Sequence, residues 1–159
     1  MEDAFELKGS NGHALRVTVL RYQFPAETRD SLNWLLVRID ATRAGRGSWT
    51  ATDPSLETHE LRALADWLEA LAAGRESSPR LYFTEPNLEL GLCESADGVS
   101  SLQVHFALES RPPWVTRGHE DDADASVEFP LVEVDLEGFA QWARRQRERF
   151  PPREPEDSP

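Results

Sequence analysis

The sequence of residues 53–74 is DPSLETHELRALADWLEALAAG, and it separates two strand-rich halves of the chain. Its leucines recur at spacings of three and four residues, which is the apolar stripe of an amphipathic helix. The stripe consists of Leu61, Leu64, Leu68 and Leu71. The Asp53-Pro54-Ser55 stretch and Thr58 offer N-cap chemistry ahead of the stripe, and Gly74 is a natural residue to follow the last turn. We therefore predict a helix over about residues 57–73.

A second helix is predicted near the C-terminus, over about residues 135–150. Apolar residues there share one face, acidic residues begin the segment and arginines crowd its end, as the helix dipole favours. Pro151 and Pro152 stop this helix because proline cannot continue it. The remaining residues, 153–159, form a proline-rich acidic tail that we expect to be disordered.

Apolar and polar residues alternate on both sides of the first helix, which is typical of strands with one buried face. The alternating runs before that helix are residues 5–8, 15–22, 33–42 and 49–51, and those after it are residues 81–83, 88–93, 102–109 and 127–131. The order is strands, helix, strands, helix, and alternation of this kind favours antiparallel pairing. The predicted fold class is therefore α+β, with a single domain over residues 1–152 built on a mainly antiparallel β-sheet.

The charge balance limits the classes of partner. The 159 residues include 29 acidic and 17 basic side chains, which gives a formal net charge of −12. Such a surface repels nucleic acid and anionic membranes, and it attracts basic proteins from a distance. A single cysteine, Cys93, excludes an internal disulfide, and no apolar run approaches the roughly 20 residues that span a bilayer. We expect a cytoplasmic protein that binds neither nucleic acid nor membrane.

No motif identifies a catalytic centre, a cofactor site or a metal site. The histidines lack metal-ligand or catalytic spacing, and no glycine-rich stretch matches a phosphate-binding loop. The acidic loop at residues 120–124 could hold a divalent cation, but a solvated charge run is the simpler interpretation. One enzymatic alternative stays open, namely a small hydrolase-like enzyme that uses His105 and a nearby carboxylate on the polar face of the sheet. That face is expected to carry Arg38, Asp40, Gln103, His105 and Glu109.

Several residues are candidates for contact with a protein partner. Trp49 and Trp114 lie in turn-rich segments beside arginines, so they are either interface anchors or plugs for the ends of the core. The Glu85-Pro86-Asn87 break either places two polar side chains at a cleft or simply ends a strand, with Asn87 bonded to its own backbone. The acidic loop is suited to steering a basic partner. The candidate partner-binding residues are Trp49, Glu85, Asn87, Arg111, Trp114, Glu120, Asp121, Asp122 and Asp124.

Eight short stretches stand out together along the chain. They are Phe5-Glu6-Leu7-Lys8-Gly9, Tyr22-Gln23-Phe24-Pro25, Asn33-Trp34-Leu35, Gly47-Ser48-Trp49, Asp53-Pro54, Phe83-Thr84-Glu85-Pro86-Asn87-Leu88, Arg111-Pro112-Pro113-Trp114 and Arg149-Phe150-Pro151. In this order and spacing they resemble the WapI family of bacterial immunity proteins, from Phe5 to about Pro152. The acidic loop and the tail after Pro152 lie outside the resemblance.

The resemblance implies a cytoplasmic antitoxin, and it brings no catalytic signature. Members of the family are thought to protect a cell from a WapA-type contact-dependent toxin whose C-terminal domain cleaves tRNA. A nuclease site is a basic groove shaped for phosphate, and an acidic protein can occupy it by mimicking that charge. We expect an immunity protein, not an enzyme, that binds and inhibits the C-terminal nuclease domain of a secreted toxin. An accessory binding domain without a toxin partner, or a homodimer formed through a sheet edge, is the remaining alternative.

Overall fold

The strands form two four-stranded antiparallel sheets in the computed structural model of the protein, which describes residues 2–25, 32–95, 97–119 and 123–153. In spatial order, the first sheet contains β1 (Ala4–Lys8), β2 (Ala14–Tyr22), β3 (Trp34–Arg43) and β4 (Gly47–Glu57). The second sheet contains β5 (Arg80–Tyr82), β6 (Leu88–Glu94), β7 (Ser100–Phe106) and β8 (Ser126–Pro130). Helix α1 (Thr58–Ala72) connects the two sheets, and α2 (Leu136–Arg149) follows the second. Short 3₁₀ helices lie at η1 (Leu108–Ser110), η2 (Ala123–Ala125) and η3 (Leu131–Glu133).

The predicted α+β class and both predicted helices are confirmed, and the sheet is divided in two. The division falls at α1, which lies between β4 and β5 in the chain, and the four strands after it pair with one another. One consequence corrects the expected polar face, whose residues do not share a sheet. Arg38 and Asp40 lie on β3 of the first sheet, Gln103 and His105 lie on β7 of the second, and Glu109 lies in η1.

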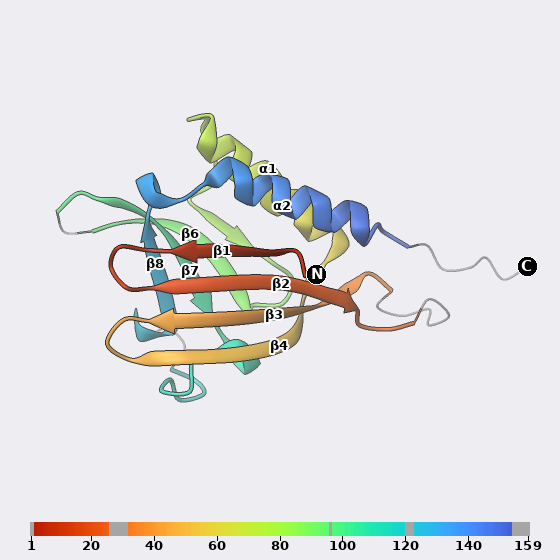
Figure 1. The fold of residues 1–159 in the computed structure, drawn as a ribbon, viewed down its shortest axis with the longest axis horizontal. Coiled ribbons are helices and arrows are strands. Elements are labelled where there is room, and N and C mark those ends of the chain that lie inside the picture. The colour runs from red at the N-terminus through yellow and green to blue at the C-terminus, as the bar shows by residue number, and fades with distance from the viewer. Residues whose placement is uncertain (1, 26–31, 96, 120–122, 154–159) are drawn as a thin grey trace, which may run out of the picture.

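A single hydrophobic core joins both sheets and both helices. Figure 1 shows the second sheet behind the first and the two helices together beside β1. At this edge Phe5 stacks on Phe139 with ring centroids 4.4 Å apart, and Trp142 donates its indole N–H to the carbonyl oxygen of Asp3 at 2.8 Å. Neither helix of the described chain is long and apolar enough to cross a bilayer.

Helix α1 begins with a capping box instead of a cap from the predicted residues. Glu57 is the N-cap residue, and its backbone N–H donates to Oε1 of Glu60 at 2.9 Å. The hydroxyl of Ser55 donates instead to the carbonyl of Asp53 at 3.2 Å. The second carboxylate oxygen of Glu60 accepts from the backbone N–H of Thr84 at 2.7 Å. The start of α1 is therefore fixed to the turn between β5 and β6.

Replacing either Leu64 or Leu68 by alanine is expected to lower the free energy of unfolding by roughly 2–5 kcal/mol, because a buried leucine leaves a cavity when truncated. Leu64 is 3% exposed and Leu68 is 0% exposed. Urea denaturation of the two variants tests this. Arg62→Ala on the exposed face of the same helix is the control, with an expected change within about 0.5 kcal/mol. Leucine variants that unfold at the same urea concentration as this control would contradict the burial of the helix.

Candidate functional site

A cleft of about 540 Å³ is lined by residues just after β2, by β3 and β4, and by connections of the second sheet. The first half of the chain contributes Gln23, Phe24, Trp34, Asp53 and Pro54 to its lining, and the second half contributes Glu85, Asn87 and Glu109. The structure thus brings the predicted pair Glu85 and Asn87 to a cleft, as one of the two interpretations of the 85–87 break required. The fold assembles this lining from five separate segments, so the cleft exists only in the folded chain.

The cleft is acidic, and no basic side chain among the described residues neutralises its charge. Asp53, Glu85 and Glu109 supply three carboxylates, and no basic side chain is among the lining residues. Within the part of the chain that the structure describes, none of these carboxylates forms an ion pair. Carboxylates elsewhere do pair with arginine: Asp3 with Arg145 at 3.0 Å, Glu69 with Arg144 at 2.7 Å and Glu89 with Arg80 at 2.8 Å. The cleft therefore concentrates uncompensated negative charge.

Ser110 organises the floor of the cleft. Its hydroxyl donates to Oδ2 of Asp53 at 3.1 Å and accepts from Nδ2 of Asn87 at 3.1 Å, while its carbonyl accepts from the indole N–H of Trp49 at 3.1 Å. Ser110 is 2% exposed and Asn87 is 4% exposed. Burial raises the pKa of Asp53, and the charge of Glu109 adds to the rise, against the opposing hydrogen bond from Ser110. The carboxylate at the centre of the cleft is thus ionised at some cost to the folded state.

The backbone of η1 adopts an unusual conformation where it enters the cleft. Leu108 has a φ of 53°, in the left-handed region that a residue with a side chain seldom adopts. Arg111 holds this turn, since its Nη1 donates to the carbonyl of Leu108 at 2.7 Å and its Nε donates to the carbonyl of Val115 at 3.2 Å. Arg111 is one of the predicted partner-binding residues, and the structure gives its guanidinium a positioning role for Glu109 and Ser110.

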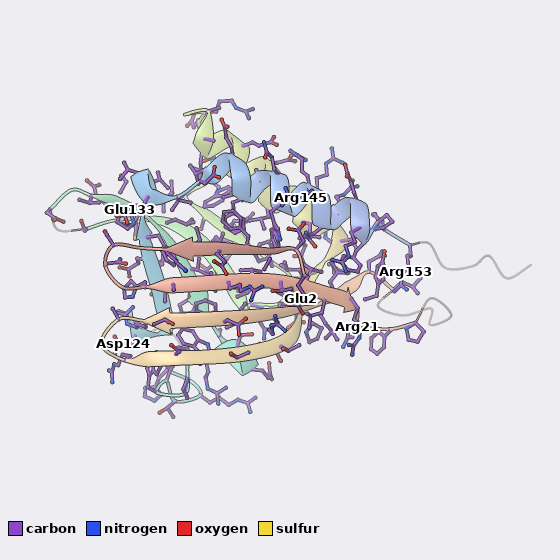
Figure 2. All side chains as sticks on the ribbon, viewed as in Figure 1. Glu2, Arg21, Asp124, Glu133, Arg145 and Arg153 are labelled. Atoms are coloured by element: carbon purple, nitrogen blue, oxygen red, sulfur yellow. The ribbon has the colours of Figure 1, made fainter. Side chains whose placement is uncertain are left out.

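Arg153 binds the segment after β2, which forms one wall of the cleft. Its guanidinium lies 3.7 Å from the centroid of the Tyr22 ring and donates to the carbonyl of Phe24 at 3.1 Å and, through Nε, to that of Leu32 at 3.0 Å. Its backbone N–H donates to Oδ1 of Asn33 at 2.7 Å. Figure 2 shows Arg153 beyond the end of α2, near the end of β2. Arg153 is therefore held against the first sheet, and residues 154–159 lie outside the described residues.

The two candidate tryptophans form one aromatic pair at the core. The rings of Trp49 and Trp114 meet edge to face at 5.1 Å, and Trp49 also packs edge-on against Phe106 at 5.1 Å. Trp49 is only 8% exposed, and Trp114 is half-buried with its indole N–H donated to the carbonyl of Asp124 at 2.9 Å. Of the two interpretations left open by the sequence, the core plug is the one that this packing supports. Trp49 is too buried to offer its ring to a partner.

Asp124, from the acidic loop, is neutralised by the hairpin between β3 and β4. It forms ion pairs with Arg46 and, at 3.3 Å, with Arg43, and the hydrogen bond from Arg46 lowers the pKa of its carboxyl. Figure 2 shows Asp124 at the hairpin end of the first sheet, away from the end of β2. The negative charge of Asp124 is therefore neutralised within the protein by these two arginines. The other members of the predicted steering loop, Glu120, Asp121 and Asp122, lie outside the described residues.

No sequence pattern groups Asp53 and Glu109 with Glu85. A signal was present in the stretches that carry the family resemblance, because seven of the eight lining residues fall within them and Glu109 alone does not. These stretches are scattered along the chain, and only their convergence in space turns them into the wall of one cleft.

Comparison with known families gives one match. The chain matches the immunity protein WapI-like family over residues 6–151, a span that begins in β1 and ends just after α2. The match includes every residue that lines the cleft. No curated protein and no solved structure matches the chain.

Asp53→Asn is expected to raise the free energy of unfolding near neutral pH. Because the pKa of Asp53 is raised in the folded protein, its ionised form destabilises the folded state. This loss of stability is complete above the folded-state pKa and absent below the ordinary pKa of an aspartate, about 3.9. The gain should therefore vanish in acid, as measured by urea denaturation across pH. Asp3→Asn is the opposite case, because Arg145 lowers the pKa of Asp3. That change should destabilise at neutral pH, with the loss shrinking as pH falls. A gain from Asp53→Asn that persists in acid would contradict the charge argument.

Arg153→Ala is expected to lower the free energy of unfolding by roughly 1–2 kcal/mol, since it removes charge-assisted hydrogen bonds to two carbonyls. It should also shift the NMR resonances of Phe24 and Trp34 in the cleft wall. Arg153→Lys keeps the charge but loses the planar fork, so it should recover only part of the stability. Unchanged Phe24 and Trp34 resonances in the alanine variant would show that Arg153 does not position the cleft.

Proposed function

Because the chain belongs to the immunity protein WapI-like family, we propose that it protects its cell by binding a toxin domain and blocking the activity of that domain. We further propose that the toxin domain is a nuclease, the C-terminal part of a secreted toxin, and that its basic surface docks on the acidic cleft. Membership of the family supports the immunity role itself. The nuclease target and the docking surface are the finer parts of the proposal.

The observation that carries the proposal is the unneutralised charge of the cleft. A nuclease holds phosphate with arginine and lysine side chains, and these protrude into the space that the substrate would fill. Three carboxylates in a concave site that lacks basic side chains offer those cations a substitute for phosphate. The net charge of −12 acts at longer range and speeds the encounter. The charge of the cleft and the net charge of the whole protein therefore favour the same basic partner.

A binding role accounts for the site better than the enzymatic alternative does. His105, the candidate for that chemistry, lies on β7 opposite Glu89 of β6, and neither residue lines the cleft. The proposal therefore assigns inhibition to contact alone, with no catalytic step. It also places the protein in the cytoplasm, where an uncleaved tRNA must be protected and where the single Cys93 needs no disulfide partner.

The test is a variant in which Asp53→Asn, Glu85→Gln and Glu109→Gln are combined. Its Kd for the cognate toxin domain should rise by at least about tenfold, a loss of about 1.4 kcal/mol, and it should fail to protect tRNA from cleavage. The matched control combines Glu76→Gln, Glu94→Gln and Glu148→Gln. These three residues are exposed, form no ion pair within the described chain and lie outside the cleft, so the control removes the same charge from elsewhere.

Two results would contradict the proposal. Equal weakening by both variants would show that net charge, and not the cleft, governs binding. Wild-type affinity in the cleft variant would show that the toxin docks on another surface. Stopped-flow association at low and high salt separates a change in steering from a change in the docked contact.

A further inference from the structure

The polar atoms that the cleft leaves without a partner are mainly acceptors. Asn87 is 4% exposed, and its Nδ2 donates to Ser110, but within the described residues its Oδ1 receives no hydrogen bond. Oδ1 of Asp53 and the carboxylates of Glu85 and Glu109 are further acceptors in the same cleft. This oxygen is not among the fully buried side-chain atoms that lack a partner in the described chain, so it keeps accessible surface and adds one more acceptor to the cleft lining. A ligand that satisfies these acceptors must carry N–H groups.

The spread of the carboxylates fits an organic cation better than a metal ion. Among the described residues, no three side chains of His, Cys, Asp or Glu lie together as a metal site requires. Asp53, Glu85 and Glu109 come from three different elements and share a cleft of about 540 Å³. A cation that reaches several of them must be extended and must present several donors.

The aromatic side chains of the lining indicate whether an arginine or a lysine side chain suits the cleft better. Trp34 is half-buried and Phe24 is 37% exposed, and both line the cleft. A guanidinium is planar, weakly hydrated and able to stack on an aromatic face while its edge donates to carboxylates. An ammonium is compact and strongly hydrated, and it has only three donors. Aromatic faces beside carboxylates therefore favour arginine.

The protein already binds the guanidinium of Arg153 in a comparable way, next to residues that line the cleft. Arg153 lies 3.7 Å from the centroid of the Tyr22 ring, and its N–H groups donate to the carbonyls of Phe24 and Leu32. The residues after β2 thus combine an aromatic face with acceptors for Arg153, and Phe24 itself borders the cleft.

We propose that the cleft is a receptor for an arginine side chain of the protein partner, with the guanidinium against Trp34 and Phe24 and its N–H groups donated to Asp53, Glu85 and Asn87. This inference rests on the proposed function for the source of the arginine, and it names the chemistry that the partner must present. Glu109, exposed at the rim, adds charge to the entrance of the cleft.

The test uses three small probes and no toxin. N-acetyl-arginine amide is titrated into the full-length protein at low ionic strength, and NMR follows the indole N–H of Trp34 and the side-chain amide of Asn87. Both resonances should shift saturably. N-acetyl-lysine amide should bind at least about tenfold more weakly, and N-acetyl-citrulline amide, a neutral analogue of similar shape, should cause no saturable shift. The variant with Asp53→Asn, Glu85→Gln and Glu109→Gln should lose the response, and the Glu76, Glu94 and Glu148 control should keep it.

The outcomes separate this inference from the proposed function. Absence of a saturable shift at Trp34 and Asn87, equal binding of the lysine probe, or equal loss in the control variant would overturn the arginine receptor. A toxin that still depends on the cleft in that case would leave the proposed function standing. Conversely, specific arginine binding in a protein whose cleft variant neutralises toxin normally would support the receptor and overturn the proposed docking surface.

Discussion

Two hydrogen bonds of Ser110 join the two halves of the chain, and a third binds it to Asn87 within the second half. Its carbonyl accepts from Trp49, and its hydroxyl accepts from Asn87 and donates to Asp53. Because Ser110 is 2% exposed, loss of any one partner would leave a buried polar group unsatisfied. The carboxylate of Glu60 reinforces this link by binding backbone N–H groups of both the start of α1 and the β5–β6 turn. The separate segments of the cleft are therefore held in one fixed arrangement.

The acidic residues include some that pair with arginine and others that line the cleft without such a pair. Most carboxylates that face the solvent near an arginine pair with it, as Asp3, Glu69 and Glu89 do, and such pairs help to fix the helices and strands. The carboxylates of the cleft have no such compensation within the described chain. Unpaired charge in a concave site destabilises the folded state, and natural proteins keep such features where binding requires them. Unpaired carboxylates that share one concave lining make the cleft the candidate site.

Residues near both ends of the described chain form hydrogen bonds with the elements that support the cleft. Near the N-terminus, Asp3 accepts from the indole N–H of Trp142 and the amide of Gln146 in α2. At the other end, Arg153 binds the segments on either side of the connection between β2 and β3. Helix α2 is thereby held to the first sheet at two points. Phe24 and Trp34, which flank this connection, receive a defined position from contacts that lie outside the cleft.

The helices, the strands and their antiparallel pairing follow from the sequence, because local periodicity records which face of an element is buried. The acidic character of the protein follows from its composition. The sequence also locates the turn with Glu85 and Asn87, since proline marks such breaks wherever they occur. Three features appear only in the folded chain: Asp53 and Glu109 join Glu85, Trp49 belongs to the core, and arginines neutralise Asp124. Each of these depends on how segments far apart in the chain are placed. Ser110 and Asp53 are separated by 57 residues, and the division into two sheets brings them to hydrogen-bonding distance.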